Sequence, residues 1–239
     1  MSILRETLSG GAAELGIKLA DNQLDQFEKF YHMVVETNKS FNLTAITDEK
    51  EFAIKHLVDS LTCLHAVSIK KDAAVLDVGA GAGFPGIPLA IYRPDLVLTM
   101  IEATEKRVKF LKKVISGLNL QGVEAFHARA EDFSRKRIFR EKYDLVVSRA
   151  VAPLAVLAEY CLPPLRTQGI FIAMKGPHVK EEIKTAQNAL AILGGIIKEI
   201  IKIELPGLGD ERKLVVINKI KATPDAYPRR SGIPAKKPL

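Results

Sequence analysis

The sequence predicts an α/β fold: a doubly wound, mostly parallel sheet with an antiparallel last strand, preceded by N-terminal helices. Three observations lead to this class. Residues 1–70 carry apolar residues at helical spacing, residues 73–193 alternate short apolar runs with helical stretches, and two apolar runs near the end flank a Gly/Pro loop. Alternating strands and helices form parallel sheets with right-handed crossovers. A terminal hairpin makes the last strand antiparallel to its neighbour.

Three helices are expected in the first seventy residues, each with one apolar face. We expect Asp21 to cap the second helix and Asp48, with Glu51 three residues later, to form a capping box for the third. The apolar faces of the three helices are Ile3, Leu4, Leu8, Ala12 and Leu15; Leu24, Phe27, Tyr31, Val34 and Val35; and Phe52, Ile54, Leu57, Leu61 and Leu64.

From residue 73 onward, the helical spacing of apolar residues gives way to short apolar runs, which are typical of buried strands. Strands are expected at 74–78, 97–101, 123–127, 144–148 and 169–174, with helices near 86–92, 105–117, 152–161 and 178–193, and a hairpin of 196–205 and 212–220 around Pro206–Asp210. The chain is therefore predicted to comprise a helical extension at 1–70, a main domain at 71–221 and a basic, proline-rich tail at 222–239. Four prolines and Gly232 in this tail predict an extended segment without a helix.

The composition excludes several classes of protein. With 239 residues, 47% of them hydrophobic and 26% charged, the chain has the balance of a globular protein. It has no run of eighteen apolar residues to span a membrane, and Arg5 and Glu6 fall where a signal peptide needs an apolar core. Two cysteines make no disulfide framework, and no Cys/His cluster has zinc spacing. We expect a cytoplasmic, metal-independent monomer.

The net charge of +7 is concentrated at the end of the chain. Residues 1–211 hold 27 basic and 27 acidic residues, whereas 212–239 hold eight basic residues and one acid. A globular body with a basic tail favours a polyanionic partner, although a solubilising tail is as compatible with the charge alone.

A glycine-rich loop follows the first predicted strand. Gly79, Gly81 and Gly83 lie where open α/β sheets bind ligands, at the carboxyl ends of the strands. The loop also matches a dinucleotide fingerprint, but that match begins late relative to the strand, and Pro85 removes an N–H that a pyrophosphate would need. The Asp77 carboxylate near the loop suits an ammonium group better than a phosphate. A nucleoside with an amino-acid end, such as S-adenosylmethionine, therefore fits best.

Further candidates end the next strands. Glu102 stands 23 positions after Gly79, near the spacing at which an acid meets ribose hydroxyls, and Ala103 and Thr104 would offer main-chain groups beside it. The main chain at Ala130 and Glu131 could read the adenine edge in the same crevice. Other interpretations remain open: a solvated glutamate at 102 and an ordinary helix start at 131.

Arg149 ends the fourth predicted strand, at the mouth of the crevice. An arginine there needs an acid, a ligand or a nucleic acid as a partner, and a structural ion pair is as compatible with its position as a ligand contact.

These segments together resemble the glucose-inhibited division protein B family, the bacterial 16S ribosomal RNA guanine-N7 methyltransferases. The resemblance covers nearly the whole chain. It rests on FNLTAI at 41–46, HLVDS at 56–60, DVGAGAGFPGIPLA at 77–90, SRAVA at 148–152, Lys175-Gly176 and YPRRSGIP at 227–234. The first motif combined with the loop is far more specific than the glycines alone.

The resemblance implies the fold of a class I S-adenosylmethionine-dependent methyltransferase, with S-adenosylmethionine as methyl donor and 16S ribosomal RNA, or a small-subunit precursor, as partner. The implied cofactor contacts are Gly79, Gly81, Gly83, Phe84, Glu102, Ala103, Thr104, Ala130, Glu131 and Arg149. The implied RNA-side residues are Asn42, His56, Asp59, Lys175, Arg229 and Arg230.

Transfer to guanine N7 needs no general base, because N7 offers an in-plane lone pair without a proton. We therefore expect no catalytic residue beyond those that position the reactants. Two alternatives stay open at this point: an NAD-dependent oxidoreductase, and a non-catalytic ribosome-binding protein.

Overall fold

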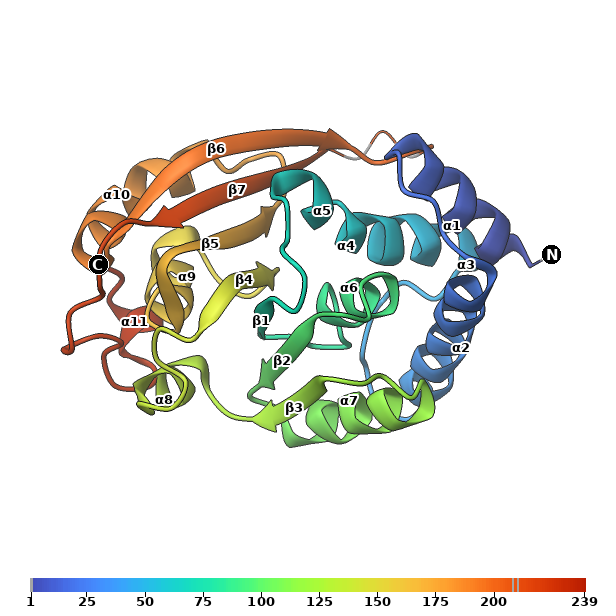
Figure 1. The fold of residues 1–239 in the computed structure, drawn as a ribbon, viewed down its shortest axis with the longest axis horizontal. Helices are drawn as coiled ribbons and strands as arrows, with labels where there is room; N and C mark the ends of the chain where they lie inside the picture. The colour runs from blue at the N-terminus through green and yellow to red at the C-terminus, as the bar shows by residue number, and fades with distance from the viewer. Residues whose placement is uncertain (1, 208, 210) are drawn as a thin grey trace.

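The computed structural model describes residues 2–207, 209 and 211–239, and contains one seven-stranded sheet in the order β3-β2-β1-β4-β5-β7-β6 (Figure 1). The strands are β1 (Ala74–Val78), β2 (Val97–Glu102), β3 (Val123–His127), β4 (Tyr143–Arg149), β5 (Leu165–Lys175), β6 (Gly195–Glu204) and β7 (Glu211–Lys219). Strands β1 to β5 pair in parallel, and β7 pairs antiparallel with both β5 and β6. The predicted fold class is confirmed. Leu208 and Asp210, in the predicted hairpin loop, lie outside the described residues.

The helices divide into an N-terminal group and the crossovers of the sheet. The N-terminal group is α1 (Ile3–Glu14), α2 (Asp21–Asn38), α3 (Glu49–Phe52), the π-helical turn η1 (Ala53–Val58), α4 (Asp59–Leu61) and α5 (Cys63–Ala66). The others are α6 (Gly86–Tyr92), α7 (Glu105–Gly117), α8 (Ala130–Arg135), α9 (Leu154–Cys161), α10 (Lys180–Leu193) and α11 (Ile233–Lys236).

Three local expectations need correction. Helix α2 is capped by Ala20 rather than Asp21, which is its first residue. The predicted third helix does begin after Asp48, whose carboxylate accepts the Glu51 N–H at 2.9 Å, but it is interrupted by the π-helical turn. The tail is not wholly extended, because α11 forms with Pro234 in its first turn, where the missing N–H costs no helical hydrogen bond.

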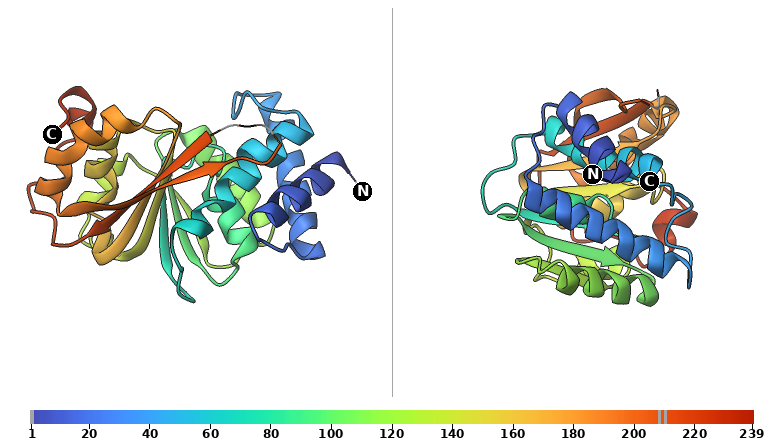
Figure 2. Two further views of the ribbon diagram at one scale, coloured as in Figure 1. Left: turned by 90° about the horizontal axis from the view of Figure 1, so that it is seen from above. Right: turned by 90° about the vertical axis from the view of Figure 1, so that its right-hand side faces the viewer.

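Two hydrophobic cores lie on opposite faces of the sheet, since successive strand residues point to opposite sides. In β4, Leu145 and Val147 pack with the N-terminal helices, α6 and α7, whereas Val146 packs with α9 and α10. Figure 2 shows the resulting shape: the N-terminal helices gather at one end of the long axis, and α11 lies at the other. Along the described part of the chain, no helix is both long and apolar enough to cross a bilayer.

Candidate functional site

A cavity of about 470 Å³ opens at the carboxyl ends of the central strands. Its walls include five of the ten predicted cofactor contacts: Gly79, Glu102, Ala103, Ala130 and Glu131. The other five, Gly81, Gly83, Phe84, Thr104 and Arg149, do not line it. The loop after β1, the end of β2 and the start of α8 thus meet around one space, as the strand order predicts for this edge of the sheet.

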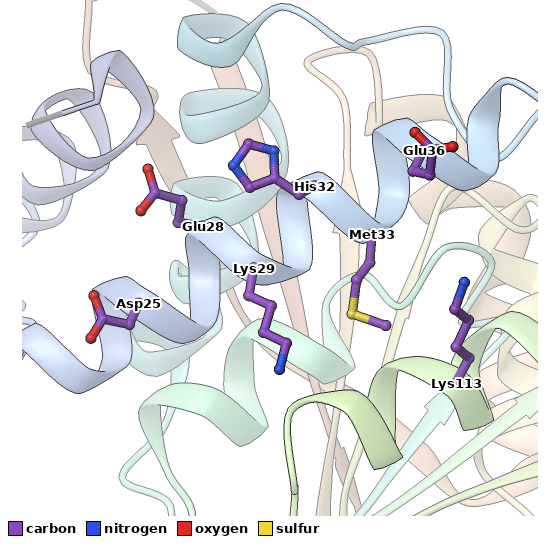
Figure 3. A pocket seen from close by; sticks show the side chains of 7 residues that line it. All are labelled: Asp25, Glu28, Lys29, His32, Met33, Glu36 and Lys113. Atoms are coloured by element: carbon purple, nitrogen blue, oxygen red, sulfur yellow. The ribbon is translucent and has the colours of Figure 1, made fainter.

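A second pocket, of about 440 Å³, lies on the outside of the N-terminal helices between α2 and α7 (Figure 3). Its lining side chains are Asp25, Glu28, Lys29, His32, Met33, Glu36 and Lys113. No strand end or glycine loop reaches this pocket, and its charges are mixed. It therefore offers no arrangement that would select a nucleoside or a polyanion.

The glycine loop has the backbone that its sequence suggests. Gly79, with φ of +74°, comes so close to Val151 that a Cβ atom would lie 2.5 Å from Cγ2 of that valine. At Gly81, with φ of +59°, the nearest atom to a Cβ would be a carbonyl oxygen 3.9 Å away, so packing does not exclude a side chain there. Gly79 is thus fixed by packing, and Gly81 by its positive φ.

Asp77 anchors the helix after this loop and does not line the cavity. Its Oδ2 accepts the Gly86 N–H at 2.9 Å, and a Cβ at Gly86 would lie 2.7 Å from the same oxygen. Complete burial raises the pKa of Asp77 to about 7. Its other oxygen, Oδ1, is buried without a hydrogen-bond partner among the described residues, so the expectation that this carboxylate serves a ligand's ammonium group stays a prediction. The structural role of Gly86 was missed.

Glu102 is the buried acid of the cavity. Its carboxylate accepts the Gly81 N–H through Oε2 at 3.1 Å and the Thr104 N–H through Oε1 at 2.8 Å. The residue is only 6% exposed, which excludes a merely solvated glutamate at the strand end. Each oxygen has one protein donor and keeps further acceptor capacity. Arg107 Nη1 lies 4.0 Å from Oε1 at the rim.

The start of α8 forms the next wall. Ala130 is the first residue of this helix, so its N–H has no intrahelical partner. The Glu131 side chain turns away from bulk solvent and accepts the Gly232 N–H at 2.8 Å. Burial, with Glu131 and Glu159 nearby, raises the pKa of Tyr160 to about 12, so the Tyr160 hydroxyl keeps its proton near neutral pH.

Arg149 points toward the N-terminal helices instead of the cavity. Its guanidinium donates to Asp59 Oδ2 at 2.8 Å and to the Lys55 carbonyl at 3.1 Å, and its Nη2 lies 3.2 Å from His56 Nδ1. The Arg149 Cζ also lies 4.9 Å from the centre of the Phe84 ring. Of the two interpretations of Arg149, the structure supports the structural ion pair.

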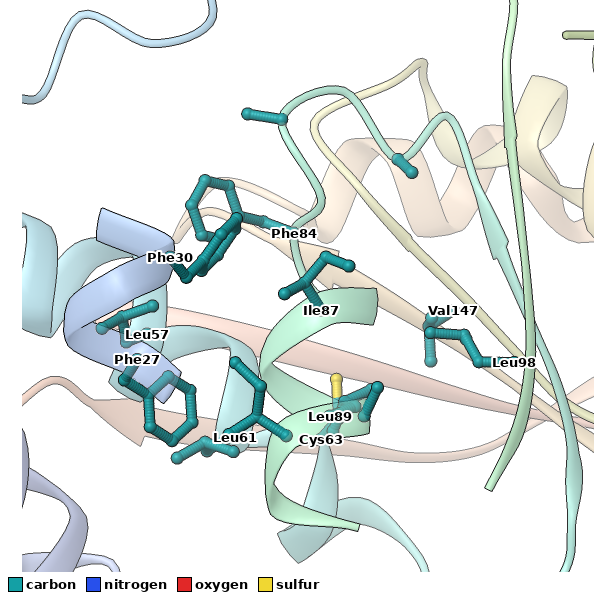
Figure 4. Packing of buried hydrophobic residues seen from close by; sticks show 14 of the residues in the cluster. Phe27, Phe30, Leu57, Leu61, Cys63, Phe84, Ile87, Leu89, Leu98 and Val147 are labelled. Carbon is teal, nitrogen blue, oxygen red and sulfur yellow. The ribbon is translucent and has the colours of Figure 1, made fainter. Parts of the chain in front are cut away.

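Phe84 joins the glycine loop to the N-terminal core. The His56 ring stacks on it with centroids 4.4 Å apart, and Phe30 of α2 lies beside it at 5.4 Å (Figure 4). Burial and the nearby Arg149 charge lower the pKa of His56 to about 3, so the imidazole is neutral. Thr44 Oγ1 lies 2.7 Å from its Nε2. This group holds the loop in place from behind.

Only two of the predicted RNA-side residues are exposed, Asn42 and Arg230. Lys175 donates to the Ala152 carbonyl at 2.7 Å and to Glu182 at 2.6 Å. Arg229 pairs with Glu159, and His56 and Asp59 are buried in the group around Arg149.

The cavity also has walls that the sequence reasoning missed. They include Arg107, Arg129, Tyr160, Gly232 and Ala235. Gly232 falls in the YPRRSGIP motif, which was the one available sign that the tail reaches the cavity. Within the described residues, no group of three or more His, Cys, Asp or Glu side chains is placed to hold a metal ion.

Comparisons with known proteins agree with this architecture. The family model described as rRNA small subunit methyltransferase G (GidB) matches residues 23–215. Ribosomal RNA small subunit methyltransferase G of Pelotomaculum thermopropionicum is 54% identical over 239 residues, and that of Desulforamulus reducens is 52% identical over 239 residues; both pairs are covered over 100% of each chain.

Solved structures share the fold at low identity. TYW2 of P. horikoshii, in complex with MeSAdo, is 18% identical with a TM-score of 0.54 over 68% of this chain and 61% of that one. Precorrin-6y C5,15-methyltransferase from Geobacter metallireducens GS-15 is 15% identical with a TM-score of 0.51 over 68% of this chain and 87% of that one. The predicted Rossmann-like methyltransferase fold is thereby confirmed. Because the family model matches most of the chain and the relatives are identical to it at more than half of all positions, this chain belongs to the rRNA small subunit methyltransferase G (GidB) family.

Proposed function

We propose that this protein transfers a methyl group from S-adenosylmethionine to N7 of a guanine in 16S ribosomal RNA of the small subunit. The observation that carries the proposal is the cavity at the carboxyl ends of β1 and β2, which the glycine loop lines at Gly79 and where the Glu102 carboxylate is buried. The names of the relatives, which state ribosomal RNA of the small subunit, support the substrate.

The residues of the cavity fit a nucleoside with an amino-acid end. Glu102 has acceptor capacity left on both oxygens, as a ribose diol requires. Ala130 and Glu131 present the main chain of a helix start toward the base, and Ile101 and Val151 supply apolar wall. The loop at Gly79 and Gly81 would take the amino-acid end.

The bound cofactor supplies a sulfonium methyl group. The protein's own residues need only hold donor and acceptor in line, because guanine N7 attacks with a lone pair and has no proton to lose. His56 fits this account, since it is neutral, buried and stacked behind Phe84, outside the cavity. Arg149 and Asp59 act in the same way, as positioning residues that fix the loop.

The RNA would approach over the exposed mouth of the cavity. Ala150 and Val151 are exposed there, and the cations Arg107 and Arg129 line the rim. Lysine and arginine hold phosphates, and a base must leave its stack to reach such a site. Asn42 and Arg230 are the exposed members of the predicted RNA-side set. We expect a single chain to act on the RNA or on a precursor particle.

The decisive experiment is transfer from methyl-labelled S-adenosylmethionine to 16S ribosomal RNA and to small-subunit particles, followed by mapping of the label. Methylation at N7 weakens the glycosidic bond, so borohydride reduction and aniline treatment should cleave the RNA at the labelled guanine. Label on a carbon, an exocyclic nitrogen or a ribose would refute the N7 assignment. In the same assay Glu102→Ala should reduce methyl transfer at low cofactor concentration, and Glu105→Ala, on the exposed surface of α7, is its matched control.

Neither alternative from the sequence is supported. The family match names a methyltransferase, which leaves no support for an NAD-dependent oxidoreductase. The open cavity with its buried acid argues against a protein that only binds ribosomes.

A further inference from the structure

We propose that the C-terminal segment 227–236 forms the wall of the cofactor cavity at its base end, and that Arg229 and Glu159 are positioning residues for cofactor affinity. This inference rests on the proposed function, because it concerns the same cavity. It changes the role expected for Arg229, which the sequence had suggested as an RNA contact.

The segment reaches the cavity directly. Gly232 and Ala235 line it together with Glu131 and Tyr160. Two contacts fix this approach: the Gly232 N–H donates to Glu131 Oε1 at 2.8 Å, and Ser231 Oγ donates to Asp132 Oδ1 at 2.6 Å. The first turn of α8 therefore holds the segment at the same place where its main chain faces the proposed base.

A buried ion pair latches the segment onto α9. Glu159 is 1% exposed, and its carboxylate accepts the backbone N–H of Arg229 at 2.7 Å, the Nε at 3.0 Å and the Nη2 at 2.7 Å. A carboxylate in this position is strongly destabilising without its partner. Docking of the segment is therefore favoured because Arg229 compensates this buried charge.

Cations of the neighbouring surface hold the carbonyl groups of the segment. Arg135 Nε donates to the Pro228 carbonyl at 2.9 Å, and Arg140 donates to the carbonyls of Tyr227 at 2.7 Å and Thr223 at 2.6 Å. These contacts and the latch all converge on residues 223–232. A basic arm that served RNA alone would need neither an ion pair with a buried acid nor satisfied carbonyls, whereas a fixed wall needs both.

The first test enlarges the wall. Ala235→Leu places three more carbon atoms at the cavity, and it should raise the Kd for S-adenosylmethionine about tenfold or more, measured by calorimetry. The Tm of the cofactor-free protein should stay unchanged, since Ala235 is exposed. Ala226→Leu is the matched control, because Ala226 is exposed in the same tail but does not line the cavity.

The outcomes separate this inference from the proposed function. An unchanged Kd for Ala235→Leu, with normal cofactor binding by the unaltered protein, overturns the wall and leaves the methyltransferase proposal intact. Failure of the unaltered protein to bind S-adenosylmethionine overturns both.

The second test addresses the latch. Arg229→Gln should raise KM for S-adenosylmethionine about tenfold while kcat and the KM for RNA change little, and Arg229→Lys should recover part of the loss. Lys237→Gln, at an exposed position of the same tail that does not line the cavity, should leave KM for S-adenosylmethionine unchanged. A rise in the KM for RNA alone, with normal cofactor affinity, would return Arg229 to the RNA interface and overturn its positioning role.

Discussion

Glu102→Ala is the substitution that most directly probes the cofactor site. In the structure the carboxylate is buried, and each oxygen accepts one main-chain N–H, from Gly81 and from Thr104. If its remaining acceptor capacity serves a ribose, the substitution removes a hydrogen bond to a charged group, worth about 1.5–3 kcal/mol. Since 1.4 kcal/mol corresponds to about a tenfold change in binding, the Kd for S-adenosylmethionine should rise about tenfold to a hundredfold.

The substitution should also lower stability. The N–H groups of Gly81 and Thr104 lose their acceptor in a partly buried setting, at a cost of about 1–3 kcal/mol if water does not replace it. The Tm of the cofactor-free variant should therefore fall. Because the two effects have different origins, they must be measured separately.

Calorimetric titration at constant salt gives the Kd, and thermal unfolding without cofactor gives the stability. Glu105→Ala is the control, since Glu105 is exposed three residues away and pairs with Lys109 on the same helix, at 2.8 Å. It should leave both quantities unchanged. A Glu102→Ala protein whose Tm falls while its Kd stays within twofold of the unaltered value would show that the carboxylate supports the loop and does not meet the ribose.

Four further predictions concern protonation, packing and RNA. The folded protein holds a proton on Asp77 up to a pH of about 7, whereas the unfolded chain releases it near pH 4, so the free energy of unfolding should fall as the pH rises between these values. In urea unfolding, Asp77→Asn should show a weaker dependence of this free energy on pH. An equal dependence in the variant and the unaltered protein would contradict the buried, protonated acid. His56 should have the opposite effect on stability, because its folded pKa of about 3 lies below the unfolded value near 6.5. Stability should therefore fall as the pH drops through this window, and His56→Phe should remove this pH dependence. An unchanged pH dependence in His56→Phe would contradict the neutral imidazole. Phe30→Ala should cost about 3–5 kcal/mol in chemical unfolding, and a loss below 1 kcal/mol would contradict its burial. Arg230→Ala should reduce the salt dependence of RNA binding by about one unit of slope, and an unchanged slope would remove this exposed cation from the interface.

The strands were predictable because their burial produces apolar runs that are visible in the local sequence. The runs expected at 74–78 and 123–127 coincide with β1 and β3, and the run at 97–101 is extended by one residue in β2. Strands buried on both faces are apolar throughout, and the helices between them carry an amphipathic period. Only β5 begins much earlier than expected, at Leu165 instead of 169, because polar residues interrupt the apolar run.

The site was predictable only where backbone position decides it. Glu102 and the glycine loop follow from being at strand ends, and the structure brings them together. The direction of Arg149 depends on Asp59, 90 positions earlier, and the role of Arg229 depends on Glu159, 70 positions earlier. Partners so far apart in the chain have no characteristic separation, so a single sequence does not reveal which residues pair. The residue type can therefore suggest that an arginine needs a partner but cannot name it.

Strand β6, at one edge of the sheet, bears on how the molecule behaves at high concentration. Among the described strands it pairs with β7 alone, so one row of its backbone groups faces outward, and Ile196 and Ile200 are 51% and 44% exposed. Exposed, apolar sheet edges recruit strands from other molecules. Here the register shifts between Ile197 and Glu199, and four of the seven residues from 198 to 204 are charged. The irregular pairing and the charges disfavour pairing of this edge with strands of other molecules, and therefore aggregation.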